Sequence, residues 1–359
     1  MSNITVLTLV DRIATFYSLK PFIFFGGSKR FTFTSDPVFC LKKDKNNILI
    51  MVRQFIKPDI VDLELMKNLR KKYEVIAFFH DDAGGGIPRL EVLPYVNLFY
   101  QKALFKDINL YKKRLYGKEL YSDYYHTKYA VQDKEHKERA IVEDDAQLNK
   151  LRLSWNIGIG DYPREQFRQR FGTALAKVFG PSISKHIYSR KKINYNPVDY
   201  NKGIFQVHAR LGLTGRPSIA YQRYLILNKI KNDPRFLIGE VSQKQYNYET
   251  KHSKMILSPF GWGELCLRDF EAVRAGSVLL KPDMGHLLTW PDIFIPFETY
   301  VPFSWDVDDL LDKVDAYLGN DQARKQIAYN AWDVYRDQMN QLENRFESII
   351  GEICSCTTQ

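Results

Sequence analysis

Hydrophobic residues in the second half of the chain form short apolar runs separated by longer segments with helical spacing. Runs of this length are typical of buried strands, and the segments between them are typical of amphipathic helices. The predicted strands are Ile204–His208, Phe236–Val241, Met255–Phe260, Ser277–Leu280 and Tyr300–Phe303. The predicted helices are Pro217–Asn232, Gln243–Ser253, Glu264–Ala275, Val307–Leu318 and Asp321–Ile350. Alternating strands and helices with short connections predict a doubly wound α/β domain with a parallel sheet.

The first half has the same pattern in a less regular form. Its predicted strands are Ile48–Val52, Val75–Phe79, Val96–Tyr100 and Leu151–Ile157, and its predicted helices are Ile60–Lys72 and Arg164–Phe179. Residues 1–45 are aromatic and irregular. Residues 111–134 are rich in Tyr and Lys with little apolar periodicity, which is typical of either an acceptor-facing insertion or a solvated excursion.

A chain of 359 residues favours two domains. We expect an N-terminal domain at residues 1–185 and a C-terminal domain at residues 186–335. The basic and weakly patterned stretch 181–202 is the expected linker. Residues 336–359 are expected to form a helix and tail that can pack back on the first domain.

One strand–turn–helix–strand unit, Met255–Pro282, contains the most informative chemistry. Its turn is Gly261-Trp262-Gly263, and Glu264 is expected to begin the helix. Arg268 and Glu271 follow at spacings that would place all three charged side chains on one helix face. A helix that begins at a glycine turn is a ready site for an anionic ligand. The alternative is a solvated helix face with intrahelical ion pairs.

The residues of this unit resemble a known family. Ser258-Pro259-Phe260-Gly261, then Arg268 to Ala272 and Gly276, resemble the nucleotide-binding segment of GT-B glycosyltransferases, with the exostosin-like members nearest. The resemblance implies two Rossmann-like α/β domains facing a central cleft. The N-terminal domain, residues 1–185, would bind the acceptor, and the C-terminal domain, residues 186–335, the nucleotide sugar. The resemblance also implies that Glu271 holds ribose hydroxyls and that Arg268 lies near the diphosphate. Many retaining members have a glutamate at the position of Gly263, so a retaining mechanism is not implied here.

Three further basic residues are candidates for binding the diphosphate. Arg210 and Arg216 follow the strand Ile204–His208, and arginine can bind a diphosphate through two hydrogen bonds at once. Lys254, just before the central strand, is a weaker candidate. The alternative for the arginines is that each pairs with a surface carboxylate.

The strand Val75–Phe79 ends in His80, Asp81 and Asp82, followed by the glycines 84–86. Ligands of open α/β sheets bind beyond the carboxyl ends of strands, so these three side chains are candidates for a general base. Asp82 is favoured because it is nearest the glycines, which would let a substrate approach. The alternative is an Asp-rich capping turn.

Composition narrows the classes of function. A hydrophobic fraction of 45% indicates packed cores, and no apolar run is long enough to span a membrane. The net charge of +10 comes from scattered basic residues without a nucleic-acid-binding motif, so we expect no nucleic-acid partner. No export signal is recognised, and the four cysteines lack zinc spacing. Asp306-Val307-Asp308 is interpreted as the cap of a helix, so neither a metal nor a cofactor is expected.

Together these observations predict a cytoplasmic glycosyltransferase of polysaccharide biosynthesis. The donor would be a UDP- or GDP-linked sugar, and the acceptor a glycan or a lipid-linked saccharide at the inner face of a membrane. We expect an inverting hexosyl or pentosyl transfer without a metal. The alternatives are a non-catalytic two-domain protein that binds sugar or nucleotide, and a basic nucleic-acid-binding module.

Overall fold

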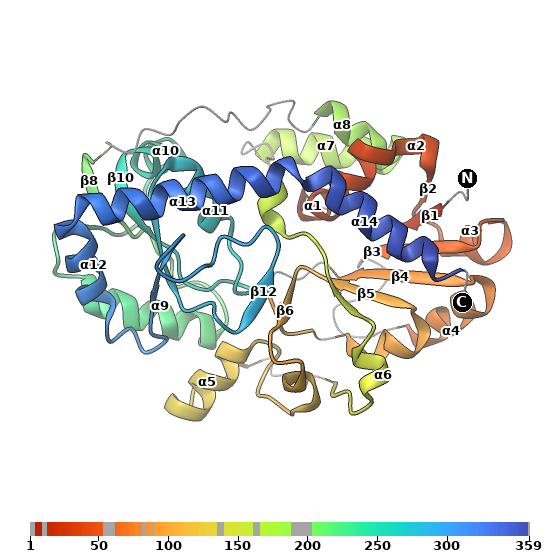
Figure 1. Cartoon of the computed structure of the whole chain (residues 1–359), viewed down its shortest axis with the longest axis horizontal. Helices are drawn as coiled ribbons and strands as arrows, with labels where there is room; N and C mark the ends of the chain where they lie inside the picture. The colour runs from red at the N-terminus through yellow and green to blue at the C-terminus, as the bar shows by residue number, and fades with distance from the viewer. Residues whose placement is uncertain are drawn as a thin grey trace.

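The computed structural model describes residues 4–8, 13–52, 62–80, 84–87, 89–134, 140–160, 166–187 and 203–357. It contains two parallel sheets with helices packed around them, one in each half of the chain (Figure 1). This arrangement confirms the predicted α/β class with two Rossmann-like halves.

The first sheet has the strand order β2-β1-β3-β4-β5-β7, and all its neighbouring strands are parallel. Its strands are β1 (Ile4–Leu7), β2 (Phe31–Thr34), β3 (Ile48–Val52), β4 (Val75–His80), β5 (Leu98–Gln101) and β7 (Leu151–Leu153). Strands β3 and β4 are buried along their whole length, because a parallel sheet is covered on both faces. Its main helices are α1 (Ile13–Pro21), α3 (Pro37–Lys42), α4 (Leu63–Lys72) and α7 (Gln166–Phe179), with the short α2 (Gly27–Arg30), α6 (Asp145–Leu148) and α8 (Ser184–Ile187).

The second sheet has the order β13-β11-β10-β8-β9 and is also parallel throughout. Its strands are β8 (Phe205–His208), β9 (Phe236–Leu237), β10 (Ser253–Leu257), β11 (Val278–Pro282) and β13 (Val301–Phe303). Its helices are α9 (Pro217–Ile230), α10 (Gln243–His252), α11 (Leu267–Ala275) and α12 (Leu310–Gly319). If the strands of this sheet are numbered 1 to 5 along the chain, their order across the sheet from β9 is 2-1-3-4-5. The first five strands of the other sheet have the same order. Each sheet therefore reverses its winding between its first and third strands, the switch point at which doubly wound proteins bind ligands.

The expectation that residues 1–45 are irregular is wrong. This stretch contains β1, α1, β2 and α3, and its run of phenylalanines forms the π-helix η1 (Phe22–Gly26). Strand β2 has the sequence FTFT, and two of its four positions are polar. A four-residue edge strand of that composition lacks the continuous apolar run by which β3 and β4 were recognised.

Residues 111–134 are not a solvated excursion. They contain the end of η4 (Ile108–Lys112) and helix α5 (Leu120–Tyr129), which packs against α9 of the other half. Tyr121 and Tyr125 are fully buried. Their hydroxyls donate to the carbonyls of Gly261, at 2.9 Å, and Trp305, at 2.8 Å. Just before this segment, β6 (Ala103–Phe105) pairs antiparallel with β12 (Leu287–Thr289), so the stretch from residue 103 to 134 joins the two halves.

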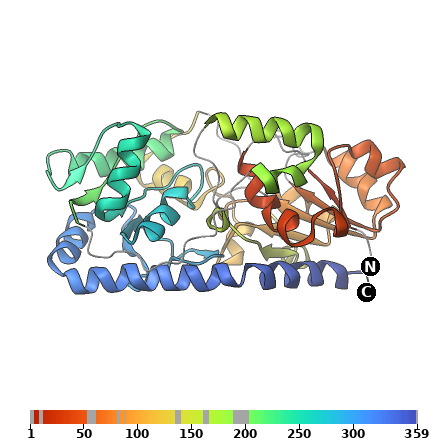
Figure 2. The same ribbon diagram turned by 90° about the horizontal axis from the view of Figure 1, so that it is seen from above.

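The chain ends in two helices that run along both halves of the molecule (Figure 2). The single helix predicted at Asp321–Ile350 is divided at Gln341 into α13 (Asp321–Asn340) and α14 (Leu342–Ser355). Helix α14 packs against α1 and β4 of the first sheet, and Glu352 accepts hydrogen bonds from Tyr100, at 2.5 Å, and Arg152, at 2.5 Å. The predicted domain limits at 185 and 335 fall within α8 and α13, and the division itself stays a prediction.

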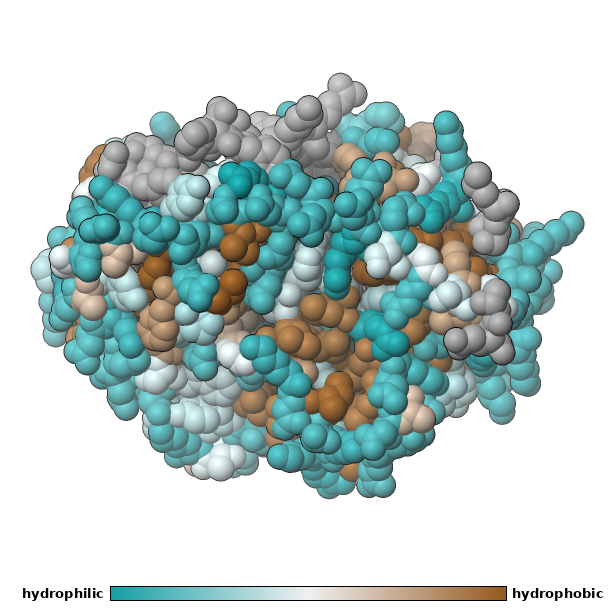
Figure 3. Space-filling model, in the orientation of Figure 1, coloured by the Kyte–Doolittle hydropathy of each residue, from teal (hydrophilic) through white to brown (hydrophobic). Residues whose placement is uncertain are grey.

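The face of the molecule shown in Figure 3 is mostly hydrophilic, including the band where Figure 1 places α13. Hydrophobic residues gather near its centre, around the β6–β12 pair that joins the two halves. Within the residues that the structure describes, no helix is long and apolar enough to cross a membrane.

Candidate functional site

The switch point of the second sheet, between β8 and β10, is filled by one arginine side chain. Arg268 reaches it from the first turn of α11. Its Nη2 donates to the carbonyl of Arg210 after β8, at 2.8 Å, and its Nη1 to the carbonyl of Leu257 at the end of β10, at 3.4 Å. The sequence thus placed Arg268 at the correct edge of the sheet. Its binding of a diphosphate stays a prediction.

Tyr246 of helix α10 links Arg268 to Glu271. The Tyr246 hydroxyl accepts a hydrogen bond from Nε of Arg268, at 3.2 Å, and donates to Oε2 of Glu271, at 3.1 Å. Burial raises the pKa of this hydroxyl, so it stays protonated and able to donate. A cation and a carboxylate, both partly exposed, therefore lie side by side at the carboxyl edge of the sheet. Tyr246 could not be predicted as a site residue, because nothing in its local sequence pattern distinguishes it from Tyr248.

Helix α11 begins three residues later than predicted. Its N-cap is Cys266, whose backbone N–H donates to the Asp269 carboxylate at 2.8 Å. This capping interaction fixes the first turn at Leu267. Glu264 therefore precedes the helix, and the expectation that it shares a helix face with Arg268 and Glu271 is wrong.

Glu264 instead faces the first half of the chain. It is fully buried, and its Oε2 accepts a hydrogen bond from the backbone N–H of Gly85 at 3.2 Å. Its Oε1 lies 3.4 Å from Nε2 of His286. The loop after β4 and the loop after β10 thus meet directly at this carboxylate.

The glycine run after β4 serves this close packing rather than the approach of a substrate. A Cβ on Gly84 would lie 2.6 Å from Oε2 of Glu264, and one on Gly86 would lie 1.5 Å from the carbonyl oxygen of Lys118. Only glycine fits where a backbone passes this close to its neighbours. The protein itself therefore fills the space that the sequence analysis gave to an acceptor.

A buried ion pair lies beneath the Gly-Trp-Gly turn. Nζ of Lys281, at the end of β11, lies 2.9 Å from Oδ1 of Asp269, and both side chains are fully buried. Ser258 donates to the same carboxylate oxygen at 2.6 Å. Burial raises the pKa of Asp269, and the Lys281 ammonium opposes that shift. This pair holds the start of α11 against the ends of β10 and β11.

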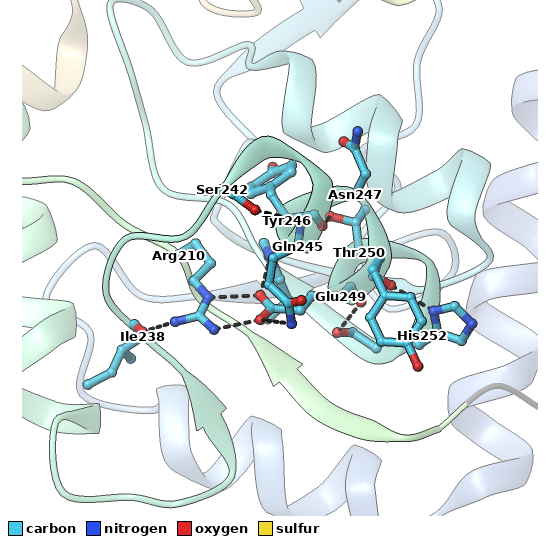
Figure 4. Close-up of polar contacts among 12 residues, drawn as sticks. Arg210, Ile238, Ser242, Gln245, Tyr246, Asn247, Glu249, Thr250 and His252 are labelled. Atoms are coloured by element: carbon cyan, nitrogen blue, oxygen red, sulfur yellow. Dashed lines mark hydrogen bonds and ion pairs between the residues drawn. The ribbon is translucent and has the colours of Figure 1, made fainter.

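Arg210 is engaged by a carboxylate of its own half. Its Nε and Nη2 donate to Oε2 and Oε1 of Glu249, at 2.8 and 2.6 Å, and its Nη1 donates to the carbonyl of Ile238 (Figure 4). Glu249 lies on α10, and its side chain is 2% exposed, against 15% for Arg210. Arg210 thus pairs with a carboxylate, as its alternative expected, but this carboxylate is buried rather than on the surface, and the guanidinium remains at the carboxyl edge.

His208, at the end of β8, adjoins this pair. Its ring is fully buried, and Nε2 lies 3.6 Å from Oε2 of Glu249. Neither ring nitrogen forms a hydrogen bond within the described part of the chain. Burial, and then the nearby Arg268, lowers the pKa of His208 to about 4, so the ring is neutral at pH 7.

Arg216 and Trp262 line the side of the site nearest the first half. Arg216 donates to Oε2 of the buried Glu119 at 2.8 Å, and its guanidinium carbon lies 5.9 Å from the centre of the Trp262 ring. Trp262 is 70% exposed, whereas Gly261 and Gly263 on either side are buried. The exposed indole is thus available to a ligand that enters beside Arg216. Glu119 was not predicted as a site residue, because it belongs to residues 111–134, whose sequence has little apolar periodicity.

Lys254 lies at the opposite end of the sheet. It is the second residue of β10, at the amino edge, and its Nζ lies 3.7 Å from Oδ1 of Asp321. The geometry does not bring Lys254 together with the other candidates, because only the carboxyl ends of the strands converge on the site.

The candidates for a general base belong to the first half. His80, the last residue of β4, is buried, and its Nδ1 lies 2.8 Å from Oε1 of Gln101 on β5. Gln101 in turn donates to the carbonyl of Gly84 at 2.7 Å. Asp81 and Asp82 lie outside the described residues.

Asp306 does not cap a helix as expected. Helix α12 starts after Asp309, and Asp306 accepts hydrogen bonds from three residues of α5. These donors are Tyr124, at 2.5 Å, Tyr129, at 2.7 Å, and Lys128, at 2.5 Å. Asp306 thus fastens α5 to the second half.

Among the described residues, no three His, Cys, Asp or Glu side chains gather into a metal site.

A scan against protein-family models and a search of curated proteins found no match. Among solved structures, the chain is similar to a glycosyltransferase from Rickettsia africae, with 13% identity, 98% of each chain covered and a TM-score of 0.45. It is similar to T4 phage BGT in complex with its UDP-glucose substrate, with 12% identity, 98% of this chain and 99% of that chain covered, and a TM-score of 0.44. It is also similar to HepE from Anabaena in complex with UDP-glucose, with 9% identity, 98% and 99% covered, and a TM-score of 0.41. At these values the likeness alone assigns no activity to this chain.

Proposed function

We propose that the protein is a GT-B glycosyltransferase of the exostosin-like type that binds its nucleotide-sugar donor at the carboxyl edge of the second sheet. One observation carries this proposal. Arg268 and Glu271 lie side by side on Tyr246 at the switch point, where doubly wound domains bind nucleotides. A guanidinium suits a diphosphate, and a carboxylate suits the hydroxyls of a ribose.

The other residues of this edge suit the donor's remaining parts. Arg216 and the exposed Trp262 lie beside one another, and together they could bind phosphate through the guanidinium and stack a sugar or base on the indole. Arg210 is held at the same edge by Glu249, and this carboxylate balances its charge. These groups would stabilise the nucleoside diphosphate as it leaves, without requiring a metal.

The transfer itself requires an acceptor hydroxyl to lose its proton. In an inverting transfer, that oxygen bonds to the anomeric carbon while the bond from this carbon to the diphosphate breaks. We assign the base to the cluster of His80, Asp81 and Asp82, with Asp82 favoured, and the acceptor to a glycan or lipid-linked saccharide. Of these three, His80 is described by the structure, and its Nδ1 lies 2.8 Å from Oε1 of Gln101.

A ligand screen followed by a turnover assay tests this proposal. UDP, GDP and their sugars are added to the protein in a thermal-shift experiment, in which a ligand at 100 times its Kd stabilises by about 2.7 kcal/mol. The nucleotide that binds is then supplied as its sugar, and release of the diphosphate is followed with and without EDTA. Release that persists in EDTA is expected. Binding without any release across glycan acceptors would favour the non-catalytic alternative, and no binding would overturn the proposal.

A further inference from the structure

Helix α7 is packed with its large apolar side chains turned outward. Phe167, Phe171 and Val178 are 77%, 52% and 75% exposed. At 100° per residue these three positions lie within about 40° of one another on the helix surface. They therefore form one apolar stripe along the outside of α7.

The opposite face of α7 is built from small residues. Gly172, Thr173 and Ala176 are buried, and these positions lie on the far side of the helix from the stripe. A surface helix of a globular protein normally buries its large apolar residues, and α7 does the reverse. Its outward stripe is therefore left without an apolar partner by the residues that the structure describes.

Basic residues flank the stripe on both sides. Arg170 and Lys177 lie along one side and Arg168 along the other, and all three are exposed. The sequence of α7, QFRQRFGTALAKVF, contains no acidic residue. In Figure 2 this light-green helix lies along the edge of the molecule opposite α13 and α14, so its outer face is not covered by them.

We propose that the outer face of α7 docks onto an anionic lipid bilayer. The phenylalanines and the valine would enter the boundary between headgroups and acyl chains, and the flanking arginines and lysine would meet anionic headgroups. This docking surface is independent of the glycosyl transfer proposed above, because α7 shares no residue with the strand edges of that site.

Two features favour a bilayer over the other occupants of a basic apolar face. A nucleic acid would be bound by the three cations, but it offers no apolar medium for a phenylalanine and a valine that are three-quarters exposed. A second copy of this chain would place the same cations opposite one another at a two-fold interface, where like charges repel. An anionic bilayer complements both the stripe and the charge.

The test is co-sedimentation of the full chain with lipid vesicles. We expect binding to vesicles of phosphatidylcholine mixed with phosphatidylglycerol, and weaker binding to phosphatidylcholine alone. Phe167→Ser and Phe171→Ser should each weaken binding about tenfold or more, because each removes a large apolar side chain from the bilayer. Glycerol phosphate in solution should not compete, since it reproduces the headgroup without the acyl chains.

Matched variants distinguish vesicle binding through α7 from nonspecific hydrophobic or electrostatic binding elsewhere on the surface. Val38→Ser, at a 53% exposed position on α3, should leave vesicle binding unchanged where Val178→Ser weakens it. The double variant Lys67→Gln and Lys71→Gln on α4 should reduce vesicle binding less than the double variant Arg168→Gln and Arg170→Gln on α7. Sedimentation that is unaffected by the phenylalanine variants overturns the proposal. Binding to duplex DNA that survives those variants, or dimerisation that they abolish without any vesicle binding, overturns it as well.

Discussion

The first five strands of both sheets have the same order, but the side chains at the carboxyl edges of the two sheets differ in their chemistry. At the second sheet, Arg268 joins the ends of β8 and β10, and Tyr246 connects it to Glu271. At the first sheet, the described end of β4 is His80, bonded to the neutral side chain of Gln101. The charged edge of the second sheet thus presents a cation and a carboxylate, whereas the described end of β4 presents an imidazole bonded to an amide.

This difference matches the needs of the two substrates proposed above. A nucleotide sugar is an anion and needs preorganised positive charge, whereas a saccharide hydroxyl is neutral and needs a base. Glu264 brings the two edges into contact through Gly85, so reacting groups held on both could meet. The comparison therefore predicts that variants of the two edges will fail in different ways.

Removing the proposed base should give the largest effect on turnover. We expect Asp82→Ala to lower turnover at saturating donor by about 10²–10⁴-fold while leaving donor affinity unchanged. Asp62→Ala is the matched control, because Asp62 only caps α4 by accepting from the N–H of Leu65 at 2.9 Å. The control should lose about 1 kcal/mol of stability and no turnover. If folded Asp82→Ala keeps the same turnover as Asp62→Ala, Asp82 is not the base.

Breaking the buried ion pair should destabilise the charged edge itself. Lys281→Met leaves the Asp269 carboxylate buried without its cation, which should cost about 3–5 kcal/mol of unfolding free energy. Lys254 lies on the neighbouring strand at the opposite edge, where its side chain is 26% exposed and its Nζ lies 3.7 Å from Oδ1 of Asp321. Lys254→Met should therefore cost less than about 1 kcal/mol. Urea denaturation compares the two variants. Similar losses would contradict the structural role of the Lys281 pair.

Removing the carboxylate of the donor site should weaken binding without unfolding the protein. We expect Glu271→Ala to reduce the affinity for the cognate nucleoside diphosphate by about 1–3 kcal/mol, because ribose hydroxyls lose a charged acceptor. Calorimetric titration measures this loss, and Glu343→Ala on α14 serves as the distant control. An unchanged affinity in folded Glu271→Ala would remove this residue from the site.

A more gradual effect should appear in the pH dependence of stability. The folded pKa of His208 is about 4, below the ordinary value of 6.5 that applies in the unfolded chain. Between these values the unfolded chain binds more protons, so the contribution of His208 to stability falls as the pH falls. The slope reaches up to about 1.4 kcal/mol per pH unit. Urea unfolding of wild type and His208→Gln across this range isolates the effect, and parallel curves would refute it.

The strands of the second half were predictable because each is a continuous apolar run bounded by turn residues. Met255–Phe260 was recognised in this way, and it matches β10 apart from its ends. The same pattern located Arg268 and Glu271 at the carboxyl edge. What it could not reveal was the start of α11, because the capping interaction of Cys266 with Asp269 depends on a carboxylate that also binds Lys281 from another strand.

Contacts between the halves were the least predictable part. Tyr121, Tyr125 and Tyr129 recur at every fourth position, which is the spacing of one helix face. That signal could have predicted α5 as a packed helix, but tyrosine is equally common on exposed surfaces. Similarly, Glu264 could be assigned to Gly85 only once both loops were placed, since they lie far apart in the sequence.

The central claim is that the donor binds to the charged edge of the second sheet. Hydrogen–deuterium exchange with and without the cognate nucleoside diphosphate tests it most directly. We predict slower amide exchange in residues 209–216 and 258–271 and no change in residues 98–105, which belong to the first sheet and the strand after it. Slower exchange confined to the end of β4, or none in either segment of the second half, would contradict the assignment.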